Sequence, residues 1–252
     1  MELGLHGRRA LVTGASSGLG LSTALALAAE GAEVMIVARS EERLAGASSS
    51  LQSQVPGAIV HTHIADVSEP GAVTSMATAA VATMGGVDIL IANAGGPPPG
   101  GFASTPLEAY LPALQLNLLS TVAMCDALVP AMQTQGWGRV VAITSITVRE
   151  PNPNLILSNM ARAGLTGFLR TLAREVAADG VTVNSVQPGL HRTARLEALH
   201  TDVDAVAASV PTRTIGDPDD FGRVAAFLCS DSARFITGSA IPVDGGASHG
   251  LQ

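Results

Sequence analysis

The sequence predicts an α/β protein with a parallel sheet covered by helices on both faces. Two observations carry this prediction. Short apolar runs alternate with helix-length segments along the chain, a pattern typical of parallel sheets. A glycine-rich loop also joins the first apolar run to a helical stretch, rather than joining two strands. The runs expected to be strands are residues 10–12, 33–38, 58–64, 88–92, 138–143, 181–186 and 240–243.

The expected strands and helices fill the chain without a linker, a low-complexity tail or an internal repeat. A chain of 252 residues can bury a large core in one unit. We therefore expect a single domain over residues 1–252. Its ligand should bind beyond the carboxyl ends of the strands, as in other parallel sheets with helices on both faces.

The loop after the first strand is interpreted as a phosphate cradle. Gly14 allows a sharp turn, Gly18 lets a diphosphate approach the backbone, and Gly20 lets the helix pack closely. The start of the helix also offers unpaired N–H groups to an anion. The alternative is an ordinary glycine turn. The residues expected to border a nucleotide here are Gly14, Ser16, Ser17, Gly18, Leu19 and Gly20.

The ends of the second and third strands carry charged residues that can read the adenosine end of a dinucleotide. An acidic side chain at the end of the second strand would bind a free 2′-hydroxyl, whereas Arg39 suits a 2′-phosphate. We therefore favour NADP(H) over NAD(H). Alternatively, Arg39 is a solvated helix-start arginine that pairs with Glu41 or Glu42. Asp66, followed by Val67, can accept from an adenine amino group or cap the next helix.

The stretch 111–132 is mostly apolar and about as long as a membrane span. Pro112, Asn117, Asp126 and Pro130 argue against insertion in a membrane. A helix that is apolar all round can instead be buried on two sides, here by the sheet and by a partner subunit. No membrane association is therefore expected.

Composition argues against other partners. The net charge is −7 and no basic cluster is present, so nucleic acid is not an expected partner. The chain contains no lysine, and all 14 basic residues are arginines. The first nine residues lack a signal-type apolar core, so we expect a cytoplasmic location. Cys125 and Cys229 are expected to be reduced, packed thiols rather than a disulfide or a metal pair.

Taken together, the motifs resemble those of the short-chain dehydrogenase/reductase family over nearly the whole chain. The similarity is greatest to 3-oxoacyl-carrier-protein reductases and their relatives. The residues that carry the resemblance are Thr13 to Gly20, Asp66, Asn93-Ala94-Gly95, Asn117, Ser145, Pro188-Gly189 and Val243-Asp244-Gly245-Gly246.

This resemblance implies a single doubly wound Rossmann-type domain with a seven-stranded parallel sheet. It implies a homodimer or homotetramer built through the long helices, and a substrate lid over residues 190–211. Beyond the first loop, the positions that it assigns to the cofactor are Asn93, Ala94 and Gly95, with Pro188, Gly189 and Thr193 at the nicotinamide end.

The family's chemistry depends on an Asn, a Ser and a Tyr-X-X-X-Lys pair on the helix after the fifth strand. Asn117 and Ser145 match, but Ser158 stands at the tyrosine position and Arg162 at the lysine position. Realignment does not restore the pair, because the chain has no lysine and its only tyrosine, Tyr110, precedes Asn117. The spacing still places the two substituted positions on one helix face. We therefore expect Asn117, Ser145, Ser158 and Arg162 to form an altered catalytic set, with Arg162 also touching the cofactor.

The substitution changes the expected proton transfer. The family's tyrosine supplies a proton with its pKa lowered by the lysine, whereas a serine hydroxyl is too weak an acid near neutral pH. Loss of a positioned general acid costs about 10² to 10⁴ in rate. Arg162 stays protonated, so it can hold a ribose or an anion but cannot relay protons. His191 could supply the proton instead, although a lone loop histidine is more often solvent-exposed.

Three other features have simple interpretations. The proline-rich loop 95–102 is expected to be a stiff wall of the substrate pocket. Arg149 and Glu150 are expected to form an exposed ion pair near substrate. His61 and His63 share a strand face, but no carboxylate or cysteine nearby completes a ligand set. We interpret them as surface residues and expect no metal site.

The leading hypothesis is an NADP(H)-dependent oxidoreductase of the short-chain type with an atypical proton donor. Its substrate would be a small-molecule carbonyl or a carrier-bound acyl group. Two alternatives remain: a non-redox enzyme that catalyses a cyclisation, dehydration or carbon–carbon bond step, and a catalytically inactive binding or scaffold subunit. An anionic or carrier-bound substrate is suggested by lid residues His191, Arg192, Arg195 and the nearby Arg213.

Overall fold

The alternation of apolar runs becomes one seven-stranded parallel sheet in the computed structural model, which describes residues 2–69, 71–199 and 202–250. The strand order is β3-β2-β1-β4-β5-β6-β7, and every neighbouring pair is parallel. This confirms the predicted Rossmann-type fold. The strands are β1 (Arg9–Thr13), β2 (Glu33–Ala38), β3 (Val60–Ile64), β4 (Ile89–Ala92), β5 (Gly138–Ile143), β6 (Val181–Pro188) and β7 (Ala240–Val243).

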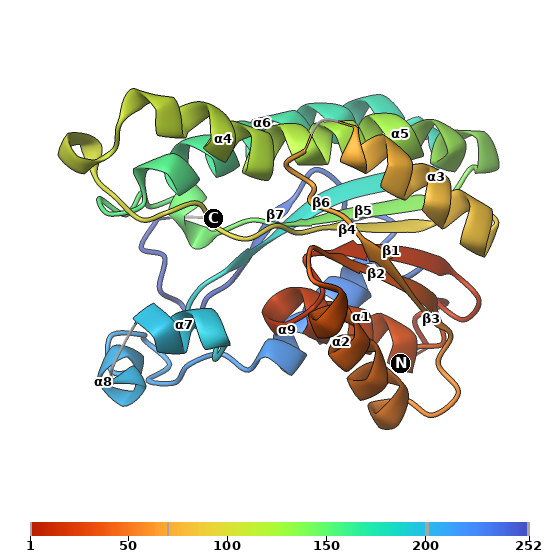
Figure 1. The fold of residues 1–252 in the computed structure, drawn as a ribbon, viewed down its shortest axis with the longest axis horizontal. Helices are drawn as coiled ribbons and strands as arrows, with labels where there is room; N and C mark the ends of the chain where they lie inside the picture. The colour runs from red at the N-terminus through yellow and green to blue at the C-terminus, as the bar shows by residue number, and fades with distance from the viewer. Residues whose placement is uncertain (1, 70, 200–201, 251–252) are drawn as a thin grey trace.

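Helices cover both faces of the sheet, with α3, α5 and α6 on one side and α1, α2 and α9 on the other (Figure 1). The short helices α7 and α8 lie apart from these layers, beyond the ends of the strands (Figure 1). The helices are α1 (Gly18–Ala29), α2 (Glu41–Gln54), α3 (Ala72–Met84), α4 (Tyr110–Leu114), α5 (Ser120–Gln135), α6 (Ile156–Val176), α7 (Ala194–Leu199), α8 (Val203–Ala207) and α9 (Pro218–Leu228).

The strand β4 and most of β1 and β2 are apolar because both faces of the sheet are buried at its centre. Leu11 packs into the core under α3, α5 and α6. Its neighbours Ala10 and Val12 pack into the core under α1, α2 and α9. Alternation of side chains across the sheet therefore builds two cores from one continuous apolar run.

Two strands begin later than predicted. The run 58–64 starts as a turn, since Ala58 N–H donates to the carbonyl of Val55 at the end of α2, and β3 begins at Val60. Asp88 stands just outside β4, where its carboxylate accepts hydrogen bonds from the backbone and side chain of Arg9. The first difference accompanies a local hydrogen bond and the second accompanies contacts across 79 positions of sequence, neither of which the apolar pattern encodes.

The apolar stretch 111–132 is not one continuous α-helix. It runs through α4, a π-helical turn at Gln115–Leu119 and α5. Residues 107–135 together are long and apolar enough to span a membrane by length and composition alone. The inner face of α5 instead packs on the sheet through Met124, Cys125, Leu128, Val129 and Met132.

The two cysteines are free and buried in different cores, on opposite faces of the sheet. Burial raises the pKa of both Cys125 and Cys229 to about 12. The prediction of two packed thiols is confirmed.

The chain leaves the middle of the sheet in two directions. From β1 the strand order proceeds outward through β2 to β3, and from β4 it proceeds outward on the other side through β5 and β6 to β7, with all strands parallel. In doubly wound sheets, the reversal between the two central strands marks the place where a dinucleotide binds. The carboxyl ends of β1 and β4 are therefore the reference point for the site.

Candidate active site

Asn93 joins the ends of the two central strands. Its backbone N–H donates to Thr13 Oγ1 at 2.9 Å, and Thr13 Oγ1 donates to the Asn93 carbonyl at 2.8 Å. Its side chain donates to the Gly14 carbonyl at 3.1 Å. Gly14 has a φ of +59°, and a methyl group on it would lie 2.7 Å from Asn93 Nδ2. Only glycine suits both the backbone conformation and this close approach.

The loop before α1 presents its backbone to a ligand. Ser17 precedes the helix in an extended conformation, and within the described part of the chain no side chain caps the first turn of α1. The first N–H groups of α1 therefore remain available to an anion. Gly95, at the end of β4, faces open space, since a methyl group there would have no described neighbour within 4 Å. These features fit a dinucleotide whose diphosphate lies over Gly18, Leu19 and Gly20.

Arg39 lies where the sequence predicts contact with a 2′-phosphate. Its guanidinium is 3.6 Å from Asp66 Oδ2, and its side chain is 79% exposed. The alternative pairing with Glu41 or Glu42 is not seen among the described residues. An arginine held loosely at the surface by one carboxylate remains available to a phosphate.

Asp66 does not cap the following helix, which begins at Ala72 with Gly71 as its N-cap. Its Oδ1 instead accepts from the Ser68 N–H at 3.0 Å and the Ser68 hydroxyl at 2.7 Å. Burial raises the pKa of Asp66, but the hydrogen bonds from Ser68 and the charge of Arg39 lower it below its usual value. The carboxylate is therefore ionised and able to accept a further hydrogen bond. Its neighbour Val67 is buried in the core.

Asn117 lies within the π-helical turn between α4 and α5. Its side-chain N–H donates to the Gly95 carbonyl at 2.9 Å. Its Oδ1 is buried and has no hydrogen-bond partner among the described residues. An extra residue inside a helical turn is a feature often found at functional sites, because it redirects a side chain. Here the turn leaves one acceptor free beside the end of β4.

Ser145 follows β5 and caps a short turn at Ile146–Val148. Its Oγ accepts from the Thr147 N–H at 3.1 Å and from the Thr147 hydroxyl at 3.0 Å. A hydroxyl has two lone pairs and one hydrogen. Because both lone pairs are engaged, the hydrogen of Ser145 is free to donate to an external acceptor such as a carbonyl oxygen.

Ser158 and Arg162 lie on α6, one turn apart and buried, with 8% of each residue exposed. No hydrogen bond of the Ser158 hydroxyl is found in the described structure. Arg162 donates to the carbonyls of Ile143 at 2.9 Å, Thr144 at 3.0 Å and Ala94 at 3.4 Å. Arg162 therefore binds the carboxyl ends of β4 and β5 together.

The charge of Arg162 has no neutralising partner, since no described carboxylate lies within ion-pair distance of it. Burial, followed by the positive charge of Arg195, lowers the pKa of Arg162 to about 10. A guanidinium with a pKa of about 10 is still protonated at neutral pH. It can bind an anion but cannot exchange a proton during turnover.

The start of the predicted lid lies against the glycine-rich loop. Pro188 pairs with Val243 in the sheet, and Gly189 N–H donates to the Val243 carbonyl at 2.9 Å. A methyl group on Gly18 would lie 3.4 Å from the methyl carbon of Thr193. The lid continues through α7 and α8, and two of its residues, 200 and 201, lie outside the described residues.

His191 is not solvent-exposed as the simple interpretation held. It is 6% exposed, its ring meets Phe221 edge-on at 5.1 Å, and its Nδ1 lies 3.3 Å from the Gly189 carbonyl. Burial lowers the pKa of His191. The ring is packed in the base of the lid, which gives it a structural role rather than that of a mobile acid.

The expected ion pair between Arg149 and Glu150 is wrong. Arg149 donates to Gln187 Oε1 and to the Ala240 carbonyl, each at 2.6 Å, and so ties β6 to β7. Glu150 instead accepts from the backbone N–H of His249 and lies 3.0 Å from His249 Nδ1. Folding brings the end of the chain to Glu150, which the local sequence could not show.

One carboxylate lies close to His61. His61 Nε2 is 2.7 Å from Glu33 Oε1 on the neighbouring strand. No group of three or more potential metal ligands is found among the described residues.

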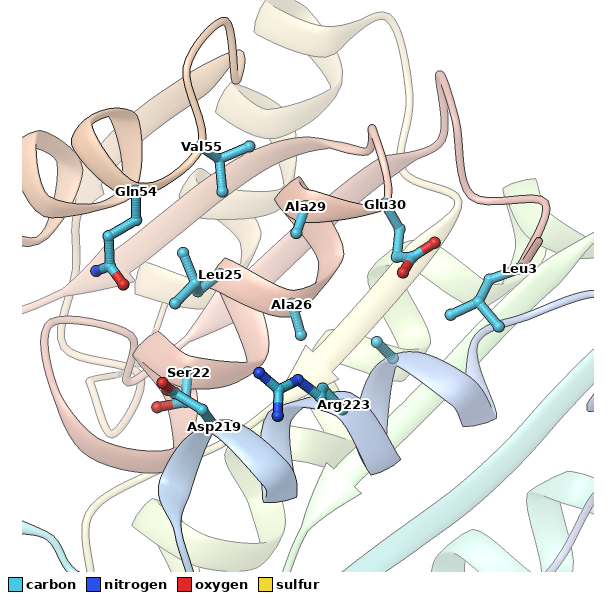
Figure 2. Close-up of a pocket in the computed structure, with 11 residues that line it drawn as sticks. Leu3, Ser22, Leu25, Ala26, Ala29, Glu30, Gln54, Val55, Asp219 and Arg223 are labelled. Carbon is cyan, nitrogen blue, oxygen red and sulfur yellow. The ribbon is translucent and has the colours of Figure 1, made fainter. Parts of the chain in front are cut away.

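A groove of about 320 Å³ lies elsewhere, between α1, α9 and the end of α2 (Figure 2). Leu25, Ala26 and Ala29 form part of its wall, with Glu30 and Arg223 also lining it. None of the residues predicted for the site takes part in it. Its lining mixes apolar with polar and charged side chains, and we assign it no role in the chemistry.

Sequence reasoning missed several residues of this region. Arg43, on the first turn of α2, reaches back to Ser17 Oγ at 3.2 Å and so joins Arg39 near the expected 2′-phosphate. Thr147 orients Ser145, and Arg195 on α7 contacts the Gly96 carbonyl at 3.4 Å. An arginine four residues after Arg39 was a visible signal, but the partners of Thr147 and Arg195 depend on folding.

Comparison with known proteins gives consistent results. A family model described as enoyl-(acyl carrier protein) reductase matches residues 14–248. Dehydrogenase/reductase SDR family member 4 of Sus scrofa is 34% identical over 254 residues, covering 98% of this chain and 89% of that protein. The 3-oxoacyl-[acyl-carrier-protein] reductase FabG of Escherichia coli (strain K12) is 36% identical over 245 residues, covering 97% and 98%.

Two solved structures are especially informative. L-sorbose reductase from Gluconobacter frateurii, complexed with NADPH and L-sorbose, has a TM-score of 0.94 and 32% identity, and each chain is covered completely. An NADPH-bound short-chain oxidoreductase from Pseudomonas aeruginosa PAO1, described as containing an atypical catalytic center, has a TM-score of 0.90 and 34% identity. The match covers 97% of this chain and 98% of that one.

Proposed function

Since the chain belongs to the short-chain dehydrogenase/reductase family of oxidoreductases, we propose that it interconverts a carbonyl and a hydroxyl group with NADP(H), using a proton donor other than the family's tyrosine. The proposal treats residues 1–252 as one domain with a lid over 190–211. The observation that carries it is the convergence of Asn117, Ser145 and Arg162 at the carboxyl ends of β4 and β5.

NADP(H) is the preferred cofactor in this proposal because two arginines lie at the adenosine end. Arg39 follows β2 and lies beside Asp66, and Arg43 contacts Ser17 Oγ. Guanidinium groups bind phosphate oxygens strongly. The NADPH-bound structures of two relatives support this choice. The loop from Gly14 to Gly20 would hold the diphosphate, and Asn93 to Gly95 with Pro188, Gly189 and Thr193 would border the rest.

The bound cofactor would supply or accept the hydride at the reacting carbon. Ser145 would hold the carbonyl oxygen, because its hydrogen is the one hydrogen-bonding position that Thr147 leaves free. Asn117 fixes the Gly95 backbone and keeps an acceptor available for water or substrate. Arg162 fixes the strand ends and adds positive charge close to the developing alkoxide.

The proton would come from solvent rather than from a side-chain acid. Ser158 cannot ionise usefully at neutral pH, but its hydroxyl can relay a hydrogen bond from water to the alkoxide. Serine is also smaller than tyrosine by a whole ring, which leaves space for that water. The relative with an atypical catalytic center shows that departure from the usual set is compatible with NADPH binding in this family.

The relatives named as 3-oxoacyl-carrier-protein reductases favour a small carbonyl compound or a carrier-bound acyl group as substrate. We propose a homodimer or homotetramer formed through the long helices. A cytoplasmic location agrees with two buried, free thiols.

The proposal is tested by following both binding and hydride transfer. NADPH fluorescence is titrated against the purified protein, and NADPH carrying deuterium at the transferable position is then incubated with a panel of ketones. Mass spectrometry should detect deuterium in the alcohol products. Absence of NADPH binding at millimolar concentration would remove the oxidoreductase function. Binding without any deuterium transfer would favour a non-redox enzyme or a binding subunit.

A further inference from the structure

Arg195 is the lid arginine that reaches the site. It lies on α7, and its guanidinium contacts the Gly96 carbonyl at 3.4 Å, just past the end of β4. A methyl group placed on Gly96 would lie 2.7 Å from Arg195 Nη2, so the guanidinium lies directly against the backbone there. The other lid arginines do not show such a contact: Arg213 turns back to the Ala208 carbonyl, and Arg192 has no side-chain bond among the described residues.

A second guanidinium lies on the same short loop. Arg162 contacts the Ala94 carbonyl, two residues before the carbonyl that Arg195 contacts. Two residues of extended chain span at most about 7 Å, so two positive groups approach one segment of backbone. The charge of Arg195 contributes to lowering the pKa of Arg162, which agrees with this proximity.

Neither guanidinium has an acidic partner in the described part of the chain. No described carboxylate lies within 4.0 Å of Arg162 or Arg195. Placing like charges together, one of them buried, is unfavourable unless an anion joins them. Carbonyl oxygens alone satisfy the hydrogen bonds of Arg162 but do not neutralise its charge.

We propose that Arg195, with Arg162 behind it, recognises a carboxylate on the substrate, so that this protein acts on oxo acids or the corresponding hydroxy acids. This inference rests on the proposed oxidoreductase function and specifies its substrate class. The pair lies at the ends of β4 and β5, beside Ser145 and Asn117. The phosphates of the cofactor would have other partners: the backbone amides at the start of α1, after β1, for the diphosphate, and Arg39, after β2, for the 2′-phosphate.

The test compares ligands that differ only in charge. Stable 4-oxo acids of five to ten carbons and their methyl esters are titrated by ligand-detected NMR and calorimetry into the protein, alone and loaded with NADP⁺. The acids should bind about 10- to 100-fold more tightly than the esters, as expected for one charged hydrogen-bonded contact. Binding is measured without turnover, so a slow chemical step does not affect the result.

Two variants locate the contact. Arg195→Gln should lower the affinity for the acids to that of the esters and change the affinity for NADPH by less than about twofold. Gly96→Ala keeps the charge of Arg195 but displaces its guanidinium. This variant should also weaken the binding of the acids and not that of the esters. Arg192→Gln removes an exposed arginine from the same segment and should change neither affinity.

The outcomes are distinguishable. Equal binding of acids and esters, or binding of neither, would overturn the proposal. A parallel loss of NADPH and acid binding in Arg195→Gln would assign this arginine to the cofactor's phosphates and would also overturn it. Failure of the wild-type protein to bind NADPH would refute the oxidoreductase function, whereas the comparison of acid and ester on the protein alone would still decide whether an anion site exists.

Discussion

The guanidinium of Arg162 donates a 3.0 Å hydrogen bond to the carbonyl of Thr144, the residue immediately before Ser145. Through this bond the substituted position on α6 sets the end of β5, from which Ser145 projects. Arg162 thus keeps the geometry of the site, while Ser158, one turn earlier on the same face, does not offer an acidic hydroxyl.

Restoring the family's pair should increase reductase activity. The double substitution Ser158→Tyr with Arg162→Lys returns a phenol and an amine to the positions of the general acid and its partner, and should raise kcat/KM on an activated ketone by about 10² or more. The matched control is Ser158→Phe with Arg162→Lys, which adds the ring without the hydroxyl and should give no gain. If the tyrosine variant folds and binds NADPH but gains nothing, the pocket itself has been rebuilt.

Removing the free hydroxyl of Ser145 should impair chemistry rather than cofactor binding. Ser145→Ala deletes the group that donates to the substrate oxygen, and should lower kcat by about 10² to 10³ with an unchanged dissociation constant for NADPH. Thr147→Val removes one of the two donors that orient this hydroxyl and should cost about tenfold or less. Activity that survives Ser145→Ala unchanged would contradict a direct role for this serine.

Arg39 should determine the choice between the two dinucleotides. Arg39→Gln removes a charged contact with the 2′-phosphate and should weaken NADPH binding by about 10- to 100-fold while NADH binding stays nearly constant. Arg43→Gln should have a smaller effect in the same direction, because Arg43 is partly held by Ser17. Arg223→Gln on α9, which breaks a surface pair with Asp220, is the control. Equal weakening of both dinucleotides would argue against a 2′-phosphate site.

The contact between Glu150 and His249 should depend on pH. The hydrogen bond with Glu150 and the charge of Glu150 raise the pKa of His249 above 6.5. The hydrogen bonds from His249 lower the pKa of Glu150 below 4.5. Because the pKa of His249 is raised on folding, its protonated ring stabilises the contact below pH 6.5. This stabilisation is lost as the pH rises through the pKa that His249 has in the folded protein. Because the pKa of Glu150 is lowered on folding, its carboxylate stabilises the contact above pH 4.5. This stabilisation is lost as the pH falls through the pKa that Glu150 has in the folded protein.

The attachment of the C-terminal segment should therefore be strongest between about pH 4.5 and 6.5. An NMR titration of the His249 ring measures this directly. Glu150→Gln should return the histidine pKa toward 6.5, whereas Glu108→Gln, at an exposed site before α4, should not. A His249 pKa that is the same in all three proteins would show that the contact does not persist in solution.

Much of the architecture was predictable from local patterns. All seven strands occur where the apolar runs indicated, and the bounds of β2, β5 and β7 agree with the expected ones. Gly14 could also be interpreted in advance, because a positive φ next to a strand end is a local requirement. Interactions between side chains were predicted less well. Arg39 pairs with Asp66 rather than with its neighbours, and Glu150 pairs with His249 rather than with Arg149.

The sequence by itself determined the fold class, the glycine-rich loop and the absence of a lysine from the chain, since these depend on periodicity, glycine spacing and residue identity. Only the tertiary structure decided the partners of the long side chains. Arg162 meets Ala94 across 68 positions of sequence, and Arg195 meets Gly96 across 99. A flexible side chain binds whichever partner folding brings within a few ångströms, and burial then fixes the electrostatic cost of its charge. Neither the partner of such a side chain nor the electrostatic cost of burying its charge is defined until the sheet has brought the strand ends together.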